Sequence, residues 1–127
     1  ACRLNDQRPA NMKRLNVCVQ VNIDNEISKS GFMLDEVESA VKEIIDLSNL
    51  QLRGFMAIPR YQDKFDAQRE PLAKLRKLID KVNDSLDNSN KLDTLSMGMS
   101  SDLEAAVFEQ ATIVRVGSDI FGHRESK

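Results

Sequence analysis

Near its C-terminal end the sequence carries two short β-prone runs, and each run is followed by a glycine turn and the start of a helix. The first run covers residues 94–97 and precedes Gly98, and the second covers residues 112–116 and precedes Gly117. β-branched and apolar residues favour strands, whereas glycine favours turns. Strands that alternate with helices are typical of a parallel sheet, so this stretch predicts an α/β fold.

The rest of the chain continues the alternation. The helix between the two C-terminal strands is expected to begin at Ser101, because Ser101 and Glu104 have the spacing of a capping box. Two earlier strands are expected at residues 15–23 and 50–58, with a helix between them. A further helix is expected to begin at Pro71, since proline suits the first helical turn. The sequence therefore predicts four parallel strands joined by helices.

Residues 15–23 show the clearest strand pattern, since leucine, valine and isoleucine alternate with polar residues and one cysteine. The aliphatic side chains are expected to pack on helices, and Cys18, Gln20 and Asn22 are expected on the opposite face. In a barrel that opposite face is the interior, and the sites of such barrels lie at the carboxyl ends of the strands.

Composition excludes several function classes. Of the 127 residues, 41% are hydrophobic and 30% are charged, as in one ordinary globular domain. The net charge of −2 gives no reason to bind nucleic acid or an anionic membrane, and no apolar run approaches the roughly 20 residues of a membrane span. Cys2 and Cys18 are isolated and the only histidine is His123, so no zinc site is expected. Isolated thiols predict a reducing, cytoplasmic location.

Both C-terminal turns combine a glycine with a serine at the start of a helix. Backbone N–H groups in such turns attract anions, above all phosphate. Arg115 lies two residues before Gly117 and therefore on the same side of the strand. A cation beside two anion-binding turns suits a ligand that has both a phosphate and a ring.

Several segments carry a resemblance to one family. They read E-x-x-K-x-G at 26–31, L-R-G-F-M-A-I-P at 52–59, S-M-G-M-S at 96–100, D-L-E-A-A at 102–106 and V-R-V-G-S-D-I-F-G at 114–122. In these segments the chain resembles the pyridoxal phosphate homeostasis proteins of the YggS/PROSC type. The resemblance covers almost the whole chain, and the two C-terminal motifs are specific.

The resemblance implies an alanine-racemase-like (β/α)8 TIM barrel, of which residues 1–127 would form the C-terminal half, strands five to eight. Residues 1–9 would be the end of a preceding helix, and residues 123–127 would be a tail. In the family, the lysine that forms a Schiff base with pyridoxal 5'-phosphate lies in a V-S-K-type motif on the first strand. This sequence has no such motif, so that lysine is expected in a missing N-terminal half.

The resemblance also assigns residues to the cofactor. It implies phosphate contacts from Ser96, Ser100, Gly117 and Ser118, and it places Arg115 at the pyridine nitrogen. The full expected set of cofactor-binding residues is Ser96, Met97, Ser100, Arg115, Gly117, Ser118, Lys29 and Met56. For Lys29 and Met56, a solvated loop lysine and a core methionine are the plainer alternatives.

No catalytic residue and no metal ligand are expected. An arginine at the pyridine nitrogen disfavours protonation of the ring and weakens it as an electron sink. The resemblance therefore implies a non-catalytic carrier of pyridoxal phosphate rather than an enzyme.

Two other functions stay open. An amino-acid racemase relative would need a second acid or base such as tyrosine, and the only tyrosine, Tyr61, follows the second strand. A phosphate-binding α/β domain of flavodoxin-like design would use the same turns without pyridoxal phosphate.

A half-barrel would also need a protein partner. The strands at 15–23 and 112–116 would be sheet edges, and the inner face with Cys18, Phe55, Met97 and Ile113 would lack its cover. The expected partner is the missing half-barrel or a second copy of the chain.

Overall fold

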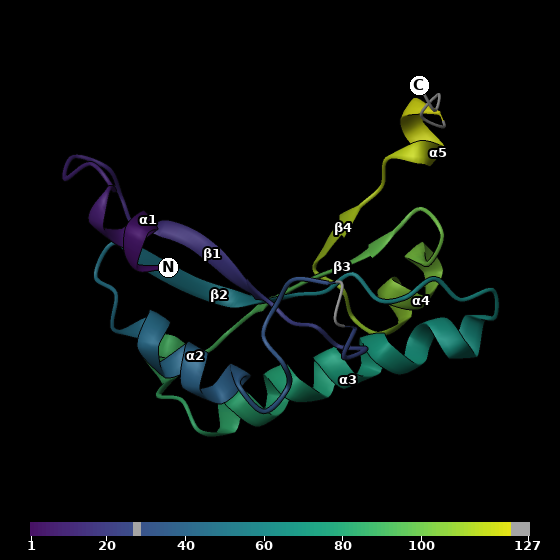
Figure 1. Ribbon diagram of the computed structural model, residues 1–127, viewed down its shortest axis with the longest axis horizontal. Coiled ribbons are helices and arrows are strands. Elements are labelled where there is room, and N and C mark those ends of the chain that lie inside the picture. Colours follow the sequence, from purple (N-terminus) through teal and green to yellow (C-terminus); the bar gives the residue numbers. More distant parts are fainter. Residues whose placement is uncertain (27–28, 123–127) are drawn as a thin grey trace.

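The computed structural model describes residues 1–26 and 29–122 and contains one parallel sheet (Figure 1). Its strands are β1 (Leu15–Gln20), β2 (Leu50–Met56), β3 (Thr94–Met99) and β4 (Ile113–Arg115), and they lie side by side in sequence order. All neighbouring pairs are parallel. The predicted α/β class with a parallel sheet is confirmed.

Helices join the strands and cover one face of the sheet. The joining helices are α2 (Val37–Ile45), α3 (Phe65–Asp84) and α4 (Leu103–Phe108). Helix α1 (Cys2–Asp6) precedes β1, α5 (Ser118–Phe121) follows β4, and a short 3-10 turn η1 (Asn88–Asn90) follows α3. Figure 1 shows α2, α3 and α4 on the same side of the sheet. A flavodoxin-like sheet has helices on both faces and a reversal in strand order. The sequential order found here contradicts that alternative and agrees with a singly wound sheet of the barrel type.

The hydrophobic core lies between the sheet and α2, α3 and α4. The strands contribute Val19, Leu52, Phe55, Leu95 and Met97, all nearly or fully buried. The aliphatic face of β1 therefore packs on helices as predicted, and Cys18 on the other face is exposed.

The expectation that Phe55 and Met97 lie on the inner face is wrong, since both are fully buried in the helix-covered core. In β2 the register shifts at Arg53, because Val17 pairs with Leu52 whereas Cys18 pairs with Gly54. This bulge reverses the side-chain alternation, so that Leu52 and Phe55 both face the helices. Met97 follows Leu95 by two residues and so lies on the same face.

Among the described residues, no helix covers the centre of the opposite face of the sheet (Figure 1). Ile113 on this face is 49% exposed, and Cys18 is also exposed. We call this surface the open face. These two residues of the expected uncovered inner face are placed correctly.

Several element boundaries differ from the prediction. β1 ends at Gln20 rather than at residue 23, and β2 ends at Met56 rather than at residue 58. Helix α3 begins at Phe65, with Pro71 inside it. Tertiary contacts explain the earlier start, because the Phe65 ring packs edge-on against the Phe108 ring at 6.0 Å between centroids.

The predicted capping box at Ser101 is also wrong. Helix α4 begins at Leu103 with Asp102 at the N-cap. The Asp102 carboxylate turns back and accepts the Met99 N–H at 2.7 Å, so it closes the turn after β3 instead of capping the helix.

Glu109 at the end of α4 ties this helix to α3. Its side chain is buried, and its carboxylate accepts a hydrogen bond from Arg69 Nε at 2.8 Å and one from Arg76 Nε at 3.2 Å. Arg69 also lies over the Phe108 ring, 3.9 Å from its centroid. Burial would raise the pKa of Glu109, but the hydrogen bonds from the two arginines lower it overall.

This lowered pKa predicts a loss of stability in acid. A carboxylate with a depressed folded pKa stabilises the fold above its ordinary value, here 4.5, and the contribution disappears as the pH falls through the folded value. We expect the urea midpoint to be flat above about pH 5 and to fall steeply below about pH 4. In Glu109→Gln, the urea midpoint should fall less steeply with decreasing pH. An equally steep fall in the variant would show that Glu109 is not the carboxylate responsible.

Candidate functional site

A surface groove of about 670 Å³ lies at the carboxyl ends of β3 and β4. Its lining comes from the two glycine turns and from α5, and consists of Met99, Ser100, Ser101, Arg115, Gly117, Ser118, Phe121 and Gly122. Ligands of parallel α/β folds bind at this edge of the sheet. Four of the eight predicted cofactor residues line the groove: Ser100, Arg115, Gly117 and Ser118.

Ser100 marks the point where backbone donors of the second turn converge. The Gly117 N–H and the Asp119 N–H both point at Ser100 Oγ, at 3.4 Å each. These hydrogen bonds are long, so a charged phosphate oxygen would compete well for the same donors. The donor set therefore fits an anion.

The turn after β3 has a fixed backbone geometry. Gly98 has a φ of +96°, and a methyl group on it would lie 2.4 Å from Ala106 Cβ. Only glycine allows both this conformation and this close approach to α4. Together with the Asp102 contact to Met99, it sets the position of Ser100 relative to the second turn.

Arg115 extends from β4 across the open face toward β2. It donates to the Ser96 carbonyl at 2.8 Å, to Ser96 Oγ at 2.7 Å and to the Ala57 carbonyl at 2.9 Å. The guanidinium is thus held at the carboxyl ends of three strands rather than in a surface ion pair. The Ser96 hydroxyl is part of this site as an acceptor for Arg115.

Met56 lies in the same part of the open face. It is the register partner of Ser96 on one side and of Gln20 on the other. Register partners in a parallel sheet share a face, so Met56, Ser96 and Arg115 come together beside the groove. The open face beside the groove therefore combines an apolar side chain with a hydroxyl and a guanidinium.

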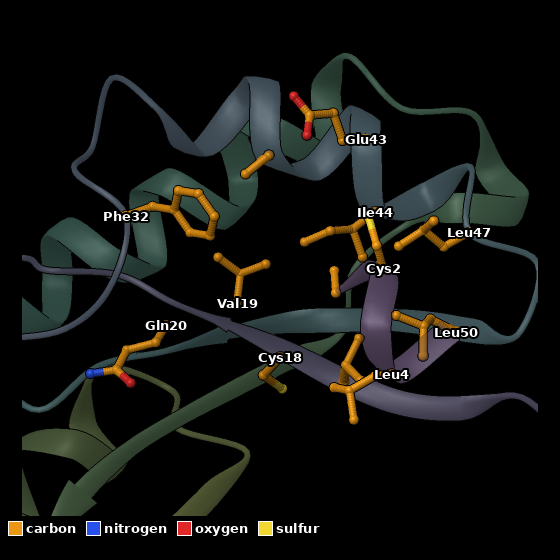
Figure 2. Close-up of a pocket in the computed structure, with 13 residues that line it drawn as sticks. Cys2, Leu4, Cys18, Val19, Gln20, Phe32, Glu43, Ile44, Leu47 and Leu50 are labelled. Atoms are coloured by element: carbon orange, nitrogen blue, oxygen red, sulfur yellow. The ribbon is translucent and has the colours of Figure 1, made fainter. Parts of the chain in front are cut away.

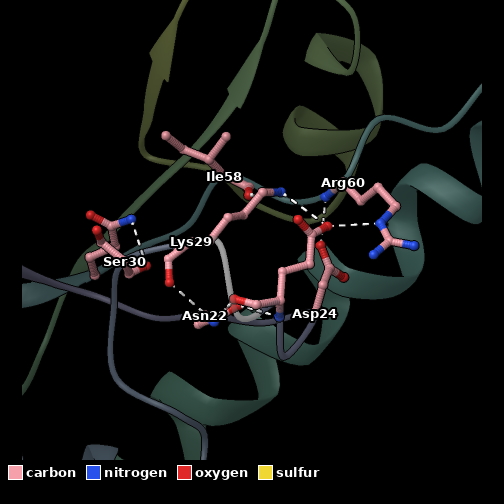
Figure 3. A network of polar contacts seen from close by, with 8 residues as sticks. Asn22, Asp24, Lys29, Ser30, Ile58 and Arg60 are labelled. Atoms are coloured by element: carbon pink, nitrogen blue, oxygen red, sulfur yellow. Dashed lines mark hydrogen bonds and ion pairs between the residues drawn. The ribbon is translucent and has the colours of Figure 1, made fainter.

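Two predicted residues lie elsewhere. The Met97 side chain is fully buried in the core, so it does not line the groove. Lys29 belongs to the loop after β1, where Nζ donates to the Ile58 carbonyl at 3.1 Å and pairs with Glu26 at 3.4 Å (Figure 3). In this chain Lys29 is therefore a bridge between the loop and the end of β2. Residues 27 and 28 of the same motif lie outside the described residues.

The Lys29 loop is held by a polar network that the sequence did not reveal. Asn22 is buried and donates to the Glu26 carbonyl at 2.7 Å, and Asp24 accepts the Arg60 N–H (Figure 3). The Arg60 side chain also donates to Glu26 at 2.7 Å, which lowers the pKa of that carboxyl. The two contacts of Arg60 join residues more than thirty positions apart, so no local motif could predict them.

A second cavity, of about 360 Å³, lies beside the outer edge of β1 between α1 and α2 (Figure 2). Apolar side chains dominate its wall, among them Leu4, Val19, Phe32, Ile44 and Leu50. Both cysteines, Cys2 and Cys18, also line it. No sequence pattern indicates this cavity, because its wall joins segments far apart in the chain.

Other site types find no support in the part of the chain that the structure describes. No helix there is long and apolar enough to cross a membrane. Within residues 1–26 and 29–122, no three metal-ligating side chains are grouped so that they could hold an ion. Tyr61 is 68% exposed, and a hydrogen bond with Asp63 raises its pKa.

Comparisons with curated proteins agree with the predicted resemblance. A pyridoxal phosphate homeostasis protein of Pseudomonas aeruginosa is 48% identical over 125 residues, which are 98% of this chain and 52% of the relative. The protein of that name from Escherichia coli K12 is 42% identical over the same share of each chain. The chain thus spans about half the length of the curated relatives it matches.

Solved structures show the same architecture. A protein of unknown function from Bifidobacterium adolescentis matches with a TM-score of 0.78 and 34% identity, over 86% of this chain and 44% of the other. PipY of Synechococcus elongatus, with pyridoxal phosphate bound, matches with a TM-score of 0.74 and 27% identity, over 87% of this chain and 50% of PipY. The family model for the alanine racemase N-terminal domain matches residues 1–125. The chain therefore belongs to the alanine racemase N-terminal domain family, and its resemblance to pyridoxal phosphate homeostasis proteins is confirmed.

Proposed function

We propose that this chain supplies the phosphate and pyridine-nitrogen end of a pyridoxal phosphate site, as strands five to eight of an alanine-racemase-like barrel. The observation that carries the proposal is the convergence of the Gly117 and Asp119 N–H groups on Ser100 Oγ, beside the Arg115 guanidinium. The pyridoxal phosphate in the PipY relative and the names of the curated relatives support the ligand.

Each group has a distinct role in the proposal. The amides of Gly117 and Asp119 and the Ser100 hydroxyl bind the phosphate. Arg115, positioned by Ser96 and the Ala57 carbonyl, faces the pyridine nitrogen. Pyridoxal phosphate supplies an electrophilic aldehyde and an electron-accepting ring when bound. A fixed cation at the ring nitrogen disfavours protonation there, so the site stores the cofactor rather than using the ring as an electron sink.

A non-catalytic role in cofactor homeostasis follows from these assignments, and we place it in the cytoplasm. The Schiff-base lysine would come from the other half of the barrel. Lys29 is bonded to Ile58 and Glu26 in this chain, so it is a secondary contact at most. A racemase would need a second acid or base, and the exposed position of Tyr61 gives this alternative no support.

An NMR titration tests the proposal. Inorganic phosphate should shift the amides of residues 100–101 and 117–119, because the donors there are weakly engaged. Pyridoxine 5'-phosphate, which has the ring but no aldehyde, should shift the same amides and also those of Met56 and Ser96. Gly117→Leu should weaken both ligands by roughly tenfold, as expected for about 1.4 kcal/mol of lost contact.

The matched control is Ser39→Ala on the exposed side of α2, which should leave both titrations unchanged. If inorganic phosphate shifts the turn amides but pyridoxine 5'-phosphate does not shift Met56 and Ser96, the result would support an anion site that does not bind pyridoxal phosphate. The absence of shifts at both turns would refute the site altogether.

A further inference from the structure

We propose that Gln68 on α3 positions the turn that carries Ser100, and thereby sets how strongly the site prefers a phosphorylated ligand over an unphosphorylated one. Gln68 lies outside the groove lining and acts through the backbone of Ser101, the neighbour of Ser100. The inference rests on the proposed function, because it concerns the phosphate end of the same site. Its support comes from the bonds of Gln68, the hollows beside them and the long contacts of Ser100.

The Gln68 side chain joins two consecutive connections between strands and helices. Its Nε2 donates to the Gln62 carbonyl at 2.9 Å, in the connection after β2, and to the Ser101 carbonyl at 3.0 Å, in the turn after β3. Both acceptors are backbone carbonyls, so only a side chain with at least two N–H groups can serve both. We call this pair of hydrogen bonds the Gln68 bridge.

The bridge fastens an exposed turn to a helix that is anchored in the core. Gln68 belongs to the first turns of α3, and the same helix buries Leu72, Leu75 and Ile79 against the sheet. The side chains of the turn itself, residues 99–102, are all exposed or half-buried. The rigidity of the packed helix therefore reaches the turn through Gln68.

Two hollows flank the bridge, with volumes of about 220 and 470 Å³. Gln68 and Ser101 belong to the walls of both, and the linings come from residues 58–68 and 99–104. Side chains therefore do not pack tightly against the turn on these two sides. Hydrogen bonds, rather than packing, determine where the turn lies.

The position of the turn matters because the contacts of Ser100 are at the limit of a hydrogen bond. Ser100 Oγ lies 3.4 Å from the amide nitrogens of Gly117 and Asp119. The Asp102 carboxylate, which accepts the Met99 N–H, closes the turn on itself. The Gln68 bridge ties the closed turn to α3, so its loss would let the Ser100 hydroxyl move away from the two amides.

The ring end of the site does not depend on this turn. The Arg115 guanidinium is held by the Ser96 carbonyl at 2.8 Å and by the Ala57 carbonyl at 2.9 Å, both at the ends of strands. Loss of the bridge should therefore weaken the binding of a phosphate group and leave the contacts of the ring unchanged.

The test uses the protein at its full length, freed of bound cofactor, and follows backbone amide shifts by NMR. Three ligands are titrated: inorganic phosphate, pyridoxine 5'-phosphate and pyridoxine. Gln68→Met removes both N–H donors and keeps a side chain of similar length. We expect it to weaken phosphate and pyridoxine 5'-phosphate by about fivefold to tenfold, the factor that corresponds to roughly one hydrogen bond, and to leave pyridoxine unchanged. Equal weakening of all three ligands would show a general structural effect and would overturn the positioning role.

A second variant and a double mutant make the test specific. Gln68→Ala cannot clash and suits a helix, so it should give the same loss even if Gln68→Met disturbs the local fold. Gln68→Met combined with Ser100→Ala should lose no more phosphate affinity than Ser100→Ala alone, because Gln68 acts through Ser100. Fully additive losses would overturn that route.

The matched control is Gln51→Met. The Gln51 side chain accepts a hydrogen bond from Arg14 at 2.9 Å near the start of β2, so the variant loses a long-range bond at the opposite end of the strand from the groove. All three titrations should match those of the parent. If the parent binds phosphate and both Gln68 variants bind it equally well, the inference fails and the proposed function stands. If the parent itself does not bind phosphate, the proposed function fails and the inference fails with it.

Discussion

Replacing Glu109 by alanine is expected to lower the free energy of unfolding by about 2–3 kcal/mol, since the variant loses two hydrogen bonds between charged groups, while solvent partly screens Arg69 and Arg76. Glu109 is 3% exposed, and both Arg69 and Arg76 donate to it. The variant would leave the two guanidinium groups at the α3–α4 contact with only the exposed carboxylates of Asp66 and Asp80, at 3.8 and 3.7 Å. The measurement is urea unfolding at neutral pH, followed by circular dichroism.

Two further variants make this test specific. Glu109→Gln keeps the shape and one acceptor, so it should lose less stability than alanine. Glu38→Gln removes a carboxylate that pairs with Lys81 but is largely exposed, and it should barely move the urea midpoint. Similar losses for Glu38→Gln and Glu109→Ala would show that burial of the Glu109 network is not what stabilises the helix pair.

Replacing Gly54 by alanine is expected to be the most damaging single methyl addition in the sheet. The added Cβ would lie 1.8 Å from the Thr94 carbonyl oxygen, which is backbone and cannot rotate away. β2 and β3 would have to separate at the bulge, where Gly54 pairs with both Cys18 and Thr94. We expect the free energy of unfolding to fall by more than about 4 kcal/mol, which is among the largest effects of single substitutions.

Gly117→Ala is the matched control. Within residues 1–26 and 29–122, no atom lies within 4 Å of a methyl group at Gly117, and its φ of −125° is open to all residues. The thermal midpoint of this variant should stay within a few degrees of that of the parent, which corresponds to a change of about 0.5 kcal/mol in the free energy of unfolding. A Gly54→Ala protein with a normal cooperative transition would contradict the close approach of the two strands.

The sequence predicted the parallel sheet and the two glycine turns because these depend on local patterns. Alternation along β1 placed Val19 and Cys18 on the correct faces, and Ser100 and Gly117 do line one groove. Phe55 was misplaced because a bulge reverses the alternation, and the glycine inside the strand was only a weak hint of it. Met97 could have been placed correctly from its two-residue spacing to Leu95.

Long-range contacts account for the other errors. The start of α3 at Phe65 depends on Phe108, and the bonds of Lys29 to Ile58 depend on where β2 ends. Local propensity favoured a helix start at Pro71, but a contact with a residue more than thirty positions away determines the start at Phe65. The cavity beside β1 has the same origin, since α1, β1 and α2 meet only in the folded chain.

The sequential strand order has a consequence for how the chain folds. Each strand pairs with the strand that follows it in the chain, so every new pairing needs the closure of only one strand–helix loop. The strand–helix units can therefore form one after another as the chain is made, although each parallel pairing closes a long loop and is intrinsically slow. β2 and β3, paired on both sides, should keep their amide protons longest in hydrogen exchange. The three-residue strand β4 should exchange early.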